Sequence, residues 1–324
     1  MVRFLRLSEP WVVPMLASSS GVKINKMFTH ARRAPDRSFW LLLLVVSLLL
    51  ALGVSCNAQM KLTPVVSSSV PTKIKGIGLN GHMEEMPVAD LKRIGIQWLR
   101  LDLGGRPMNA DKINHIVQHY KDFGILWIIS TENHDPVEEA KLVVKAGVRD
   151  LEIMNEPDYQ FIDPKVYAQL FKKIRAAVGN DVRLYGMASG KWVWSQPFIK
   201  ASLAQKLPID VLTFHAYLDN NERMPAMTTW VNEAKQYGLP VVVSEVGFPT
   251  MRNYRAIYGE GASYGDLFVK TKKALAGVPW AWYDGPNPPD NFDAGMFDHT
   301  PERGWYPNKN YIDVCRALGI KYPD

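Results

Sequence analysis

Two glutamates each stand at the end of a short apolar run. Glu156 closes "LEIMNE" within residues 151–158, and Glu245 closes "PVVVSE" within residues 240–248. Short, uniformly apolar runs of this kind are typical of strands buried on both faces of a parallel sheet. A carboxylate at the exit of such a strand costs desolvation free energy, so its presence there indicates chemistry. Two such carboxylates suit hydrolysis of a glycosidic bond, where one protonates the leaving oxygen and the other acts at the anomeric carbon.

Apolar and helical segments alternate regularly along residues 74–324. Several helical segments are followed by glycine, as expected just beyond a helix C-terminus. Alternation at this spacing predicts parallel βαβ units, and eight of them predict a closed (β/α)8 barrel in a single domain. A doubly wound open sheet is the alternative, but no GxGxxG opens a helix here. The predicted strands are residues 74–79, 96–101, 125–130, 150–154, 182–187, 210–214, 240–244 and 279–283, and the predicted helices are residues 84–94, 111–123, 136–146, 164–178, 195–206, 228–237, 263–276 and 308–318.

The front of the chain has the pattern of an export signal. Residues 39–54, "FWLLLLVVSLLLALGV", are uncharged and apolar, and three arginines precede them within eight residues. A basic flank before an apolar run is typical of a secretory signal. The run is shorter than the roughly 20 residues of a membrane span, which makes an uncleaved anchor the weaker alternative. We therefore predict a leader over residues 1–58, a short tether over residues 59–73 and a catalytic domain over residues 74–324.

Cys56 bears on where the exported protein resides. It follows "LGVS", which resembles a bacterial lipoprotein cleavage site, whereas ordinary cleavage after Ala58 would release a soluble product. A lipid anchor at Cys56 and a soluble periplasmic or extracellular protein both remain open. After the leader only Cys315 remains, so the mature chain forms no internal disulfide and no cysteine-based metal site.

The charge of the chain argues against nucleic acid as a partner. The formal net charge is +6, but residues 1–58 contain seven Lys or Arg and two Asp or Glu, and so carry +5 of it. The body of the chain is close to neutral and lacks the basic surface that phosphate backbones require. We expect a monomer whose partner is a sugar.

Four segments at the predicted strand ends together resemble the clan A glycoside hydrolases. They are "MNEPD" at the fourth strand, "FHAY" at the sixth, "SEVGF" at the seventh and "WAWYDG" at the eighth. The resemblance implies a retaining β-glycosidase that uses no cofactor and no metal, with Glu156 as acid/base and Glu245 as nucleophile. It also implies substrate-binding roles for Asn155, Arg100, His215, Tyr217 and Trp282, of which Arg100 supports the nucleophile and Trp282 is the platform beneath the sugar.

Some of these residues have structural alternatives. Arg100 could pair with Asp102 as scaffolding, and a single histidine such as His215 is often a hydrogen-bonded core residue. "GKWVWSQP" follows the fifth predicted strand, so we expect Trp192 and Trp194 in a loop on the catalytic face, where indoles stack on sugars. Trp230 lies in a predicted helix and is expected in the core.

The resemblance does not settle on one family. "NEPD" in a compact barrel resembles family 128, "VVVSEVGFPT" resembles a stretch of family 17, and the eighth strand and tail resemble families 5 and 39. The first two families favour β-1,3-glucan or a related β-glycan as the substrate, and short loops favour an open cleft and endo action. One alternative is a cell-surface barrel that binds glycan without turnover. Another is a metal-dependent hydrolase that uses His215 with carboxylates, although metal barrels usually gather several histidines and only His82, His134 and His215 lie near predicted strand ends.

Overall fold

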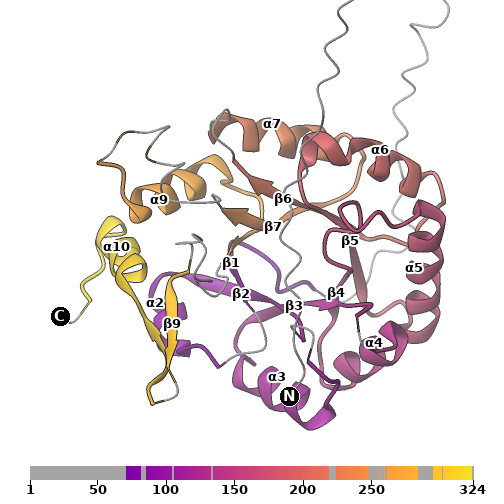
Figure 1. Cartoon of the computed structure of the whole chain (residues 1–324), viewed down its shortest axis with the longest axis horizontal. Coiled ribbons are helices and arrows are strands. Elements are labelled where there is room, and N and C mark those ends of the chain that lie inside the picture. The colour runs from indigo at the N-terminus through magenta and orange to yellow at the C-terminus, as the bar shows by residue number, and fades with distance from the viewer. Residues whose placement is uncertain are drawn as a thin grey trace, which may run out of the picture. The chain divides into compact units, whose positions relative to one another are not determined.

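The computed structural model shows a closed barrel of eight parallel strands in the order β1 to β8, with helices around it (Figure 1). The predicted (β/α)8 fold is confirmed. The structure describes residues 71–81, 85–103, 106–132, 134–218, 224–247, 255, 259, 261–283, 295–300 and 302–322. The predicted leader, its apolar run, Cys56 and most of the tether lie outside these residues, so those predictions stay predictions. Within the described residues, no helix is long and apolar enough to cross a membrane.

The elements follow the predicted order, with boundaries that mostly move by a few residues. A two-stranded hairpin, β9 (Phe297–Thr300) and β10 (Gly304–Pro307), precedes the last helix and was not predicted. The barrel strands are β1 (Ile77–Asn80), β2 (Ile96–Leu101), β3 (Gly124–Ile129), β4 (Asp150–Ile153), β5 (Arg183–Ser189), β6 (Val211–Tyr217), β7 (Val241–Gly247) and β8 (Trp280–Tyr283). The helices are α2 (Val88–Arg93), α3 (Ala110–His119), α4 (Pro136–Lys145), α5 (Pro164–Val178), α6 (Trp192–Leu203), α7 (Met224–Lys235), α9 (Tyr264–Ala274) and α10 (Lys309–Ala317).

Local sequence fixes where several helices begin. Asp135 and Asp163 each precede a proline, and their carboxylates accept backbone N–H groups of the first turns of α4 and α5. Proline suits the first helical position because its missing N–H has no partner there in any case. Ser263 and Asp266 form a reciprocal capping box at the start of α9. These caps fix where the chain turns from strand ends into helices, and therefore how the loops at that end of the barrel run.

Alternation along the strands separates two sets of buried side chains. On β4, Leu151 and Ile153 belong to the large apolar cluster between barrel and helices, which also includes Trp230 as predicted. Asp150 and Glu152 alternate with them and face the barrel interior. A second apolar cluster shares that interior and consists of Ile74, Trp98, Leu126, Tyr185, Val211, Val242 and Ala281.

The barrel interior contains a polar group at its N-terminal end. Asp150, at the start of β4, accepts hydrogen bonds from Arg183 Nε at 2.7 Å and from the Tyr185 hydroxyl at 2.8 Å. Thr72, ahead of β1, lies 3.3 Å from the same tyrosine hydroxyl. This ion pair closes the end of the barrel where the strands begin, which in such barrels is the end concerned with stability.

A β-bulge in β7 determines which of its side chains enter the barrel. Phe214 and His215 are adjacent on β6, but they pair with Val243 and Glu245, so one residue of β7 is extra. On the other side, Val243 to Val246 lie opposite Trp280 to Trp282, which again leaves one residue over. An extra residue reverses the alternation of a strand. Val242 and Glu245 therefore both face inward, although they are three residues apart.

Candidate active site

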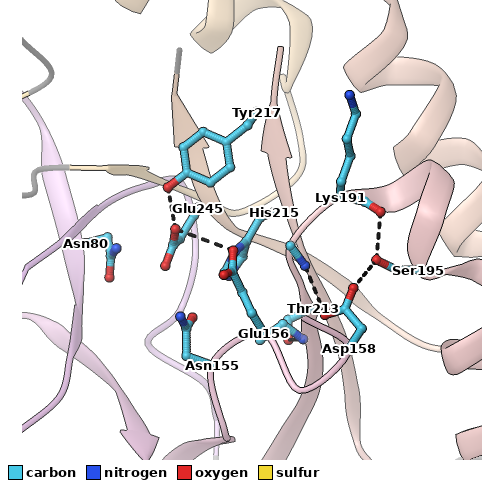
Figure 2. Close-up of polar contacts among 12 residues, drawn as sticks. Asn80, Asn155, Glu156, Asp158, Lys191, Ser195, Thr213, His215, Tyr217 and Glu245 are labelled. Atoms are coloured by element: carbon cyan, nitrogen blue, oxygen red, sulfur yellow. Dashed lines mark hydrogen bonds and ion pairs between the residues drawn. The ribbon is translucent and has the colours of Figure 1, made fainter. Parts of the chain in front are cut away.

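Glu245 lies at the mouth of the barrel and is held by side chains from two other strands, β2 across the barrel and β6 beside it. Its side chain is buried, and one carboxylate oxygen accepts a hydrogen bond from Arg100 Nη1 on β2. The other oxygen accepts the hydroxyl of Tyr217 on β6 (Figure 2). His215 Nδ1, also on β6, lies 3.5 Å from this second oxygen. Both oxygens thus have fixed donors, and the carboxylate is held in one orientation.

Arg100 connects most of the site through a fully buried guanidinium. Its Nε donates to Glu152 on β4 at 2.5 Å, and its Nη1 donates to Asn80 at 3.1 Å as well as to Glu245. Its Nη2 donates to Asn155 Oδ1 at 2.8 Å. The prediction that this arginine supports Glu245 agrees with these contacts. Neither Glu152 nor Asn80 was singled out from the sequence. The one sequence signal was the position of Glu152 between two apolar residues of a predicted strand.

Glu156 reaches the same pocket from the turn after β4. The backbone of Met154 and Glu156 has positive φ angles of 64° and 47°, a region that ordinary residues rarely adopt. The Glu156 N–H donates to Ala188 O at 3.0 Å, across to β5, where Met187 and Ala188 also have positive φ. Backbone strain of this kind costs about 1–3 kcal/mol per residue and tends to occur at functional sites. The two bent strand ends hold each other and turn Glu156 inward.

His215 lies between the two glutamates. Its Nδ1 is 2.9 Å from Glu156 Oε1 and 3.5 Å from Glu245 Oε2 (Figure 2). One side-chain ligand atom each from Glu156, His215 and Glu245 lie within 4.8 Å of one another. Glu156 is partly exposed, whereas the other two side chains are buried. Solvent therefore reaches the site at Glu156.

The electrostatics of the site keep Glu245 ionised. Burial raises the pKa of Glu245, but His215, the Arg100 guanidinium and the Tyr217 hydrogen bond together outweigh burial and lower it. Burial and the charge of Glu245 raise the pKa of Tyr217 well above its usual value. The phenol therefore stays protonated and donates to the carboxylate. An ionised carboxylate held by fixed donors is suited to act as a nucleophile.

The same three side chains are the cluster that could bind a cation in the part of the chain that the structure describes. Arg100 contacts Glu245 directly, lies 3.4 Å from His215 Nε2, and opposes a cation there by charge repulsion. His134, which the metal alternative also considered, instead bonds Glu139 at 2.8 Å, and His82 lies outside the described residues. The arrangement suits proton transfer and nucleophilic attack better than metal binding.

A second set of contacts fixes the loop that carries Glu156. Asp158 accepts the hydroxyl of Ser195 at 2.5 Å (Figure 2) and the Gly190 N–H at 3.3 Å. The ring of Tyr159 covers Gly190. A Cβ on Gly190 would come within 2.3 Å of that ring, so glycine is needed here. These contacts join the loop after β4 to the first turn of α6.

The structure corrects two of the three predicted sugar-stacking tryptophans. Trp282 on β8 faces away from the barrel interior, packs against Phe268 and Trp280, and donates its Nε1–H to Tyr264. Trp192 is buried inside α6, where it packs against Phe214 and bonds Glu233. Both are unavailable to a sugar. The expected loop at residues 190–197 is instead the start of a helix, and it buries Trp192.

Tyr283 and the third predicted tryptophan, Trp194, have different surroundings. Tyr283, the residue after Trp282, faces inward, with its ring 5.9 Å from that of Tyr217. Trp194 is 68% exposed on α6, with Lys191 Nζ 4.8 Å from its ring. Of the predicted residues, the structure brings together Glu156, Glu245, Asn155, Arg100, His215 and Tyr217.

No family profile and no curated protein sequence matches the chain. Its fold is similar to that of an endo-β-1,3-glucanase of family 128 from Amycolatopsis mediterranei, in complex with laminaripentaose. That similarity has 15% identity and a TM-score of 0.52, and covers 75% of this chain and 99% of the other. A monomeric β-xylosidase from Caulobacter crescentus matches at 14% identity and TM-score 0.52, over 79% and 70% of the two chains. The family 53 catalytic domain of Ignisphaera aggregans matches at 16% and 0.50, over 68% and 87%. The chain thus shares the (β/α)8 barrel fold of these enzymes, and the barrel is the fold that its sequence predicted.

We predict that Tyr217→Phe raises the pKa of Glu245, because the phenol donates a hydrogen bond to the charged form. Carbon-13 NMR titration of labelled glutamate carboxyl groups measures this, with Glu245→Gln identifying the signal. In the wild type the depressed pKa contributes stability above about pH 4.3, which is lost as pH falls through the folded value. Tyr185→Phe, at the other end of the barrel, is the matched control and should leave the Glu245 titration unchanged. An unchanged titration in Tyr217→Phe would contradict the assigned hydrogen bond.

Proposed function

We propose that the protein is a retaining β-glycosidase that hydrolyses a β-linked polysaccharide or oligosaccharide. The observation that carries this proposal is the placement of Glu156 and Glu245, each offering a carboxylate oxygen within 4.8 Å of the other. Retaining enzymes hold their carboxyl groups about 5–5.5 Å apart, whereas inverting enzymes need roughly 6.5–9.5 Å to admit a water molecule between them. The 4.8 Å limit applies to one oxygen of each carboxylate, and two carboxyl groups whose oxygens approach this closely support direct attack by one of them on the sugar.

The proposed reaction has two steps. An oxygen of Glu245 forms a bond to the anomeric carbon while the glycosidic bond breaks, and Glu156 gives its proton to the leaving oxygen. Glu156 then takes a proton from water, whose oxygen attacks the anomeric carbon and releases Glu245. The depressed pKa of Glu245 suits the nucleophile. Glu156 is the more exposed of the two, which suits the group that meets leaving group and water.

The surrounding side chains have matching roles in this proposal. Arg100 and Tyr217 hold the nucleophile, and His215 contacts both carboxylates. Asn155 accepts from Arg100 through Oδ1, which leaves its amide nitrogen for a sugar hydroxyl beside the reacting carbon. Tyr283 replaces Trp282 as the proposed aromatic surface beneath the sugar. Trp194 is the proposed stacking residue farther along the cleft.

For the substrate we propose a β-glucan, with the β-1,3 linkage as the first to test, and endo action. The support is the sequence resemblance to two β-1,3-glucanase families together with the laminaripentaose that the structurally similar endo-β-1,3-glucanase binds. Turnover of laminarin by residues 59–324, compared with xylan, mannan and galactan, tests both the activity and the linkage. Binding without any released product would favour the glycan-binding alternative.

We predict opposite behaviour for the two glutamate variants. Glu245→Ala should abolish turnover until azide replaces the nucleophile and yields the inverted α-glycosyl azide. Glu156→Ala should lose roughly 10²–10⁴-fold on the natural glycan but far less on an aryl glycoside with a good leaving group, since that group needs no proton. Product analysis by NMR and initial rates measure these outcomes. If either variant keeps the wild-type rate on the glycan, the role assigned to that glutamate is wrong.

We also predict that Tyr283, and not Trp282, contributes to substrate binding. Tyr283→Ala should raise KM for the glycan about tenfold, which corresponds to roughly 1.4 kcal/mol for a lost aromatic contact, with little change in the free energy of unfolding. Trp282→Phe should instead lower that free energy by roughly 1–3 kcal/mol and leave KM close to the wild-type value. Steady-state kinetics and urea unfolding of both variants measure this. The reverse pattern would restore the sequence-based assignment.

Export is proposed on the basis of the apolar run at residues 39–54 and its basic flank. When the full-length gene product is expressed in a Gram-negative host, we expect the protein to be recovered outside the cytoplasm and to lack residues 1–55 or 1–58. Mass spectrometry of the N-terminal peptide distinguishes the two: a lipid-modified Cys56 indicates an anchor, whereas an unmodified Gln59 indicates a soluble product. Recovery of the intact leader in the cytoplasm would show that export was inferred wrongly.

A further inference from the structure

Glu152 is a buried carboxylate that takes no part in the reaction described above. It lies on β4, four residues before Glu156, and none of its surface is exposed. Its Oε2 accepts the Arg100 Nε–H at 2.5 Å, while its Oε1 has no hydrogen-bond partner among the described residues. An ionised carboxylate with an unsatisfied oxygen is costly to bury. If support of Arg100 were its only use, a neutral amide of the same shape could supply the same acceptor.

The negative charge of Glu152 competes with Glu245 for the same guanidinium. Glu152 contacts Nε and Glu245 contacts Nη1, so one positive charge faces two carboxylates from two strands. Burial lowers the pKa of Arg100, but the charges of Glu152 and then of Glu245 raise it. With the guanidinium shared in this way, neither carboxylate is fully neutralised. In a buried site with a low effective dielectric constant, the negative charge that is left unneutralised has a large electrostatic effect.

We propose that Glu152 is a positioning residue that both fixes the orientation of Arg100 and, through its charge, keeps Glu245 basic enough to act as a nucleophile. This inference rests on the proposed hydrolytic function. Without the charge of Glu152, Arg100 and Glu245 would form an isolated buried ion pair. That pair would stabilise the carboxylate in its resting state, and attack on the sugar would then have to overcome the added stabilisation.

The other charged or titratable groups around Glu245 do not supply this effect. His215 and Tyr217 on β6 contact it directly, and each stabilises its ionised form. Glu156 reaches the pocket from the turn after β4, but its protonation changes during the reaction, so its charge is not constant. Asp102, just beyond β2, acts on Arg100 more weakly than Glu152 does. Among these groups, Glu152 is the buried acid in direct contact with Arg100 whose charge the reaction leaves unchanged.

Glu152→Gln and Glu152→Asp separate charge from geometry. The glutamine keeps the acceptor for Arg100 Nε and loses the charge, so the acidic limb of the kcat/KM profile should move about one pH unit lower. We expect kcat to fall about tenfold as well. The aspartate keeps the charge but is one methylene too short to hold Nε, so kcat should fall with a smaller displacement of the limb. A purely structural role would leave the limb in place in both variants.

Asp150→Asn is the matched control. Asp150 is a buried carboxylate on the same strand, two residues away, with an arginine partner that the active site does not use. It should lose stability without moving the acidic limb. An unmoved or upward-shifted limb in Glu152→Gln overturns the proposal, and so does an equal shift in Asp150→Asn.

Two further outcomes are distinguishable. If circular dichroism shows that Glu152→Gln does not fold, Glu152→Asp carries the test, and a displaced limb at unchanged kcat overturns the proposal. If the wild-type chain hydrolyses no glycan, the proposed function fails by itself. The carbon-13 titration of Glu245 then tests the inference without substrate, and a Glu245 signal that titrates at the same pH in wild type and Glu152→Gln overturns it.

Discussion

The interior of this barrel has to accommodate one fully buried guanidinium, and most of the site follows from that requirement. Burying an unpaired arginine would cost many kilocalories per mole, so partners must come from strands that the fold brings together. Glu152 comes from β4 and Glu245 from β7, Asn80 and Asn155 accept two further N–H groups, and His215 Nε2 lies 3.4 Å from Nη2. Side chains that are far apart in sequence thus meet around Arg100, and the contacts that fix one of them also hold the others.

The backbone deviates from regular strand geometry where these side chains must enter the barrel. The bulge in β7 turns Glu245 inward, and positive φ angles at Met154 and Glu156 turn the chain after β4 toward the pocket. The cost of these deviations is offset by hydrogen bonds between neighbouring strand ends, such as Glu156 N–H to Ala188 O. Regular strands supply the rigid frame, and the local irregularities direct the reactive groups.

The sequence predicted the barrel and most of the site because both leave strong local signals. Apolar runs, helix-ending glycines and acidic strand ends are readable residue by residue. The sequence did not show which side of β8 faces inward, because "WAWY" has an aromatic side chain on each face of the strand. Only the pairing of β8 with β1 and β7 decides between Trp282 and Tyr283. Trp192 was placed wrongly because α6 begins three residues before the predicted start. Glu152 was missed because its role depends on Arg100, which is 52 residues away.

The two ends of the barrel show why similar ion pairs serve different purposes. Near one end of β4, Asp150 has a single arginine partner and accepts a tyrosine hydroxyl, so its charge is closely matched by its surroundings. Two residues along the same strand, Glu152 shares its arginine with a second carboxylate and keeps one oxygen unsatisfied. A matched pair stabilises the fold and resists change. An arginine shared between two acids leaves negative charge uncompensated at the mouth of the barrel, where a sugar with developing positive charge could use it.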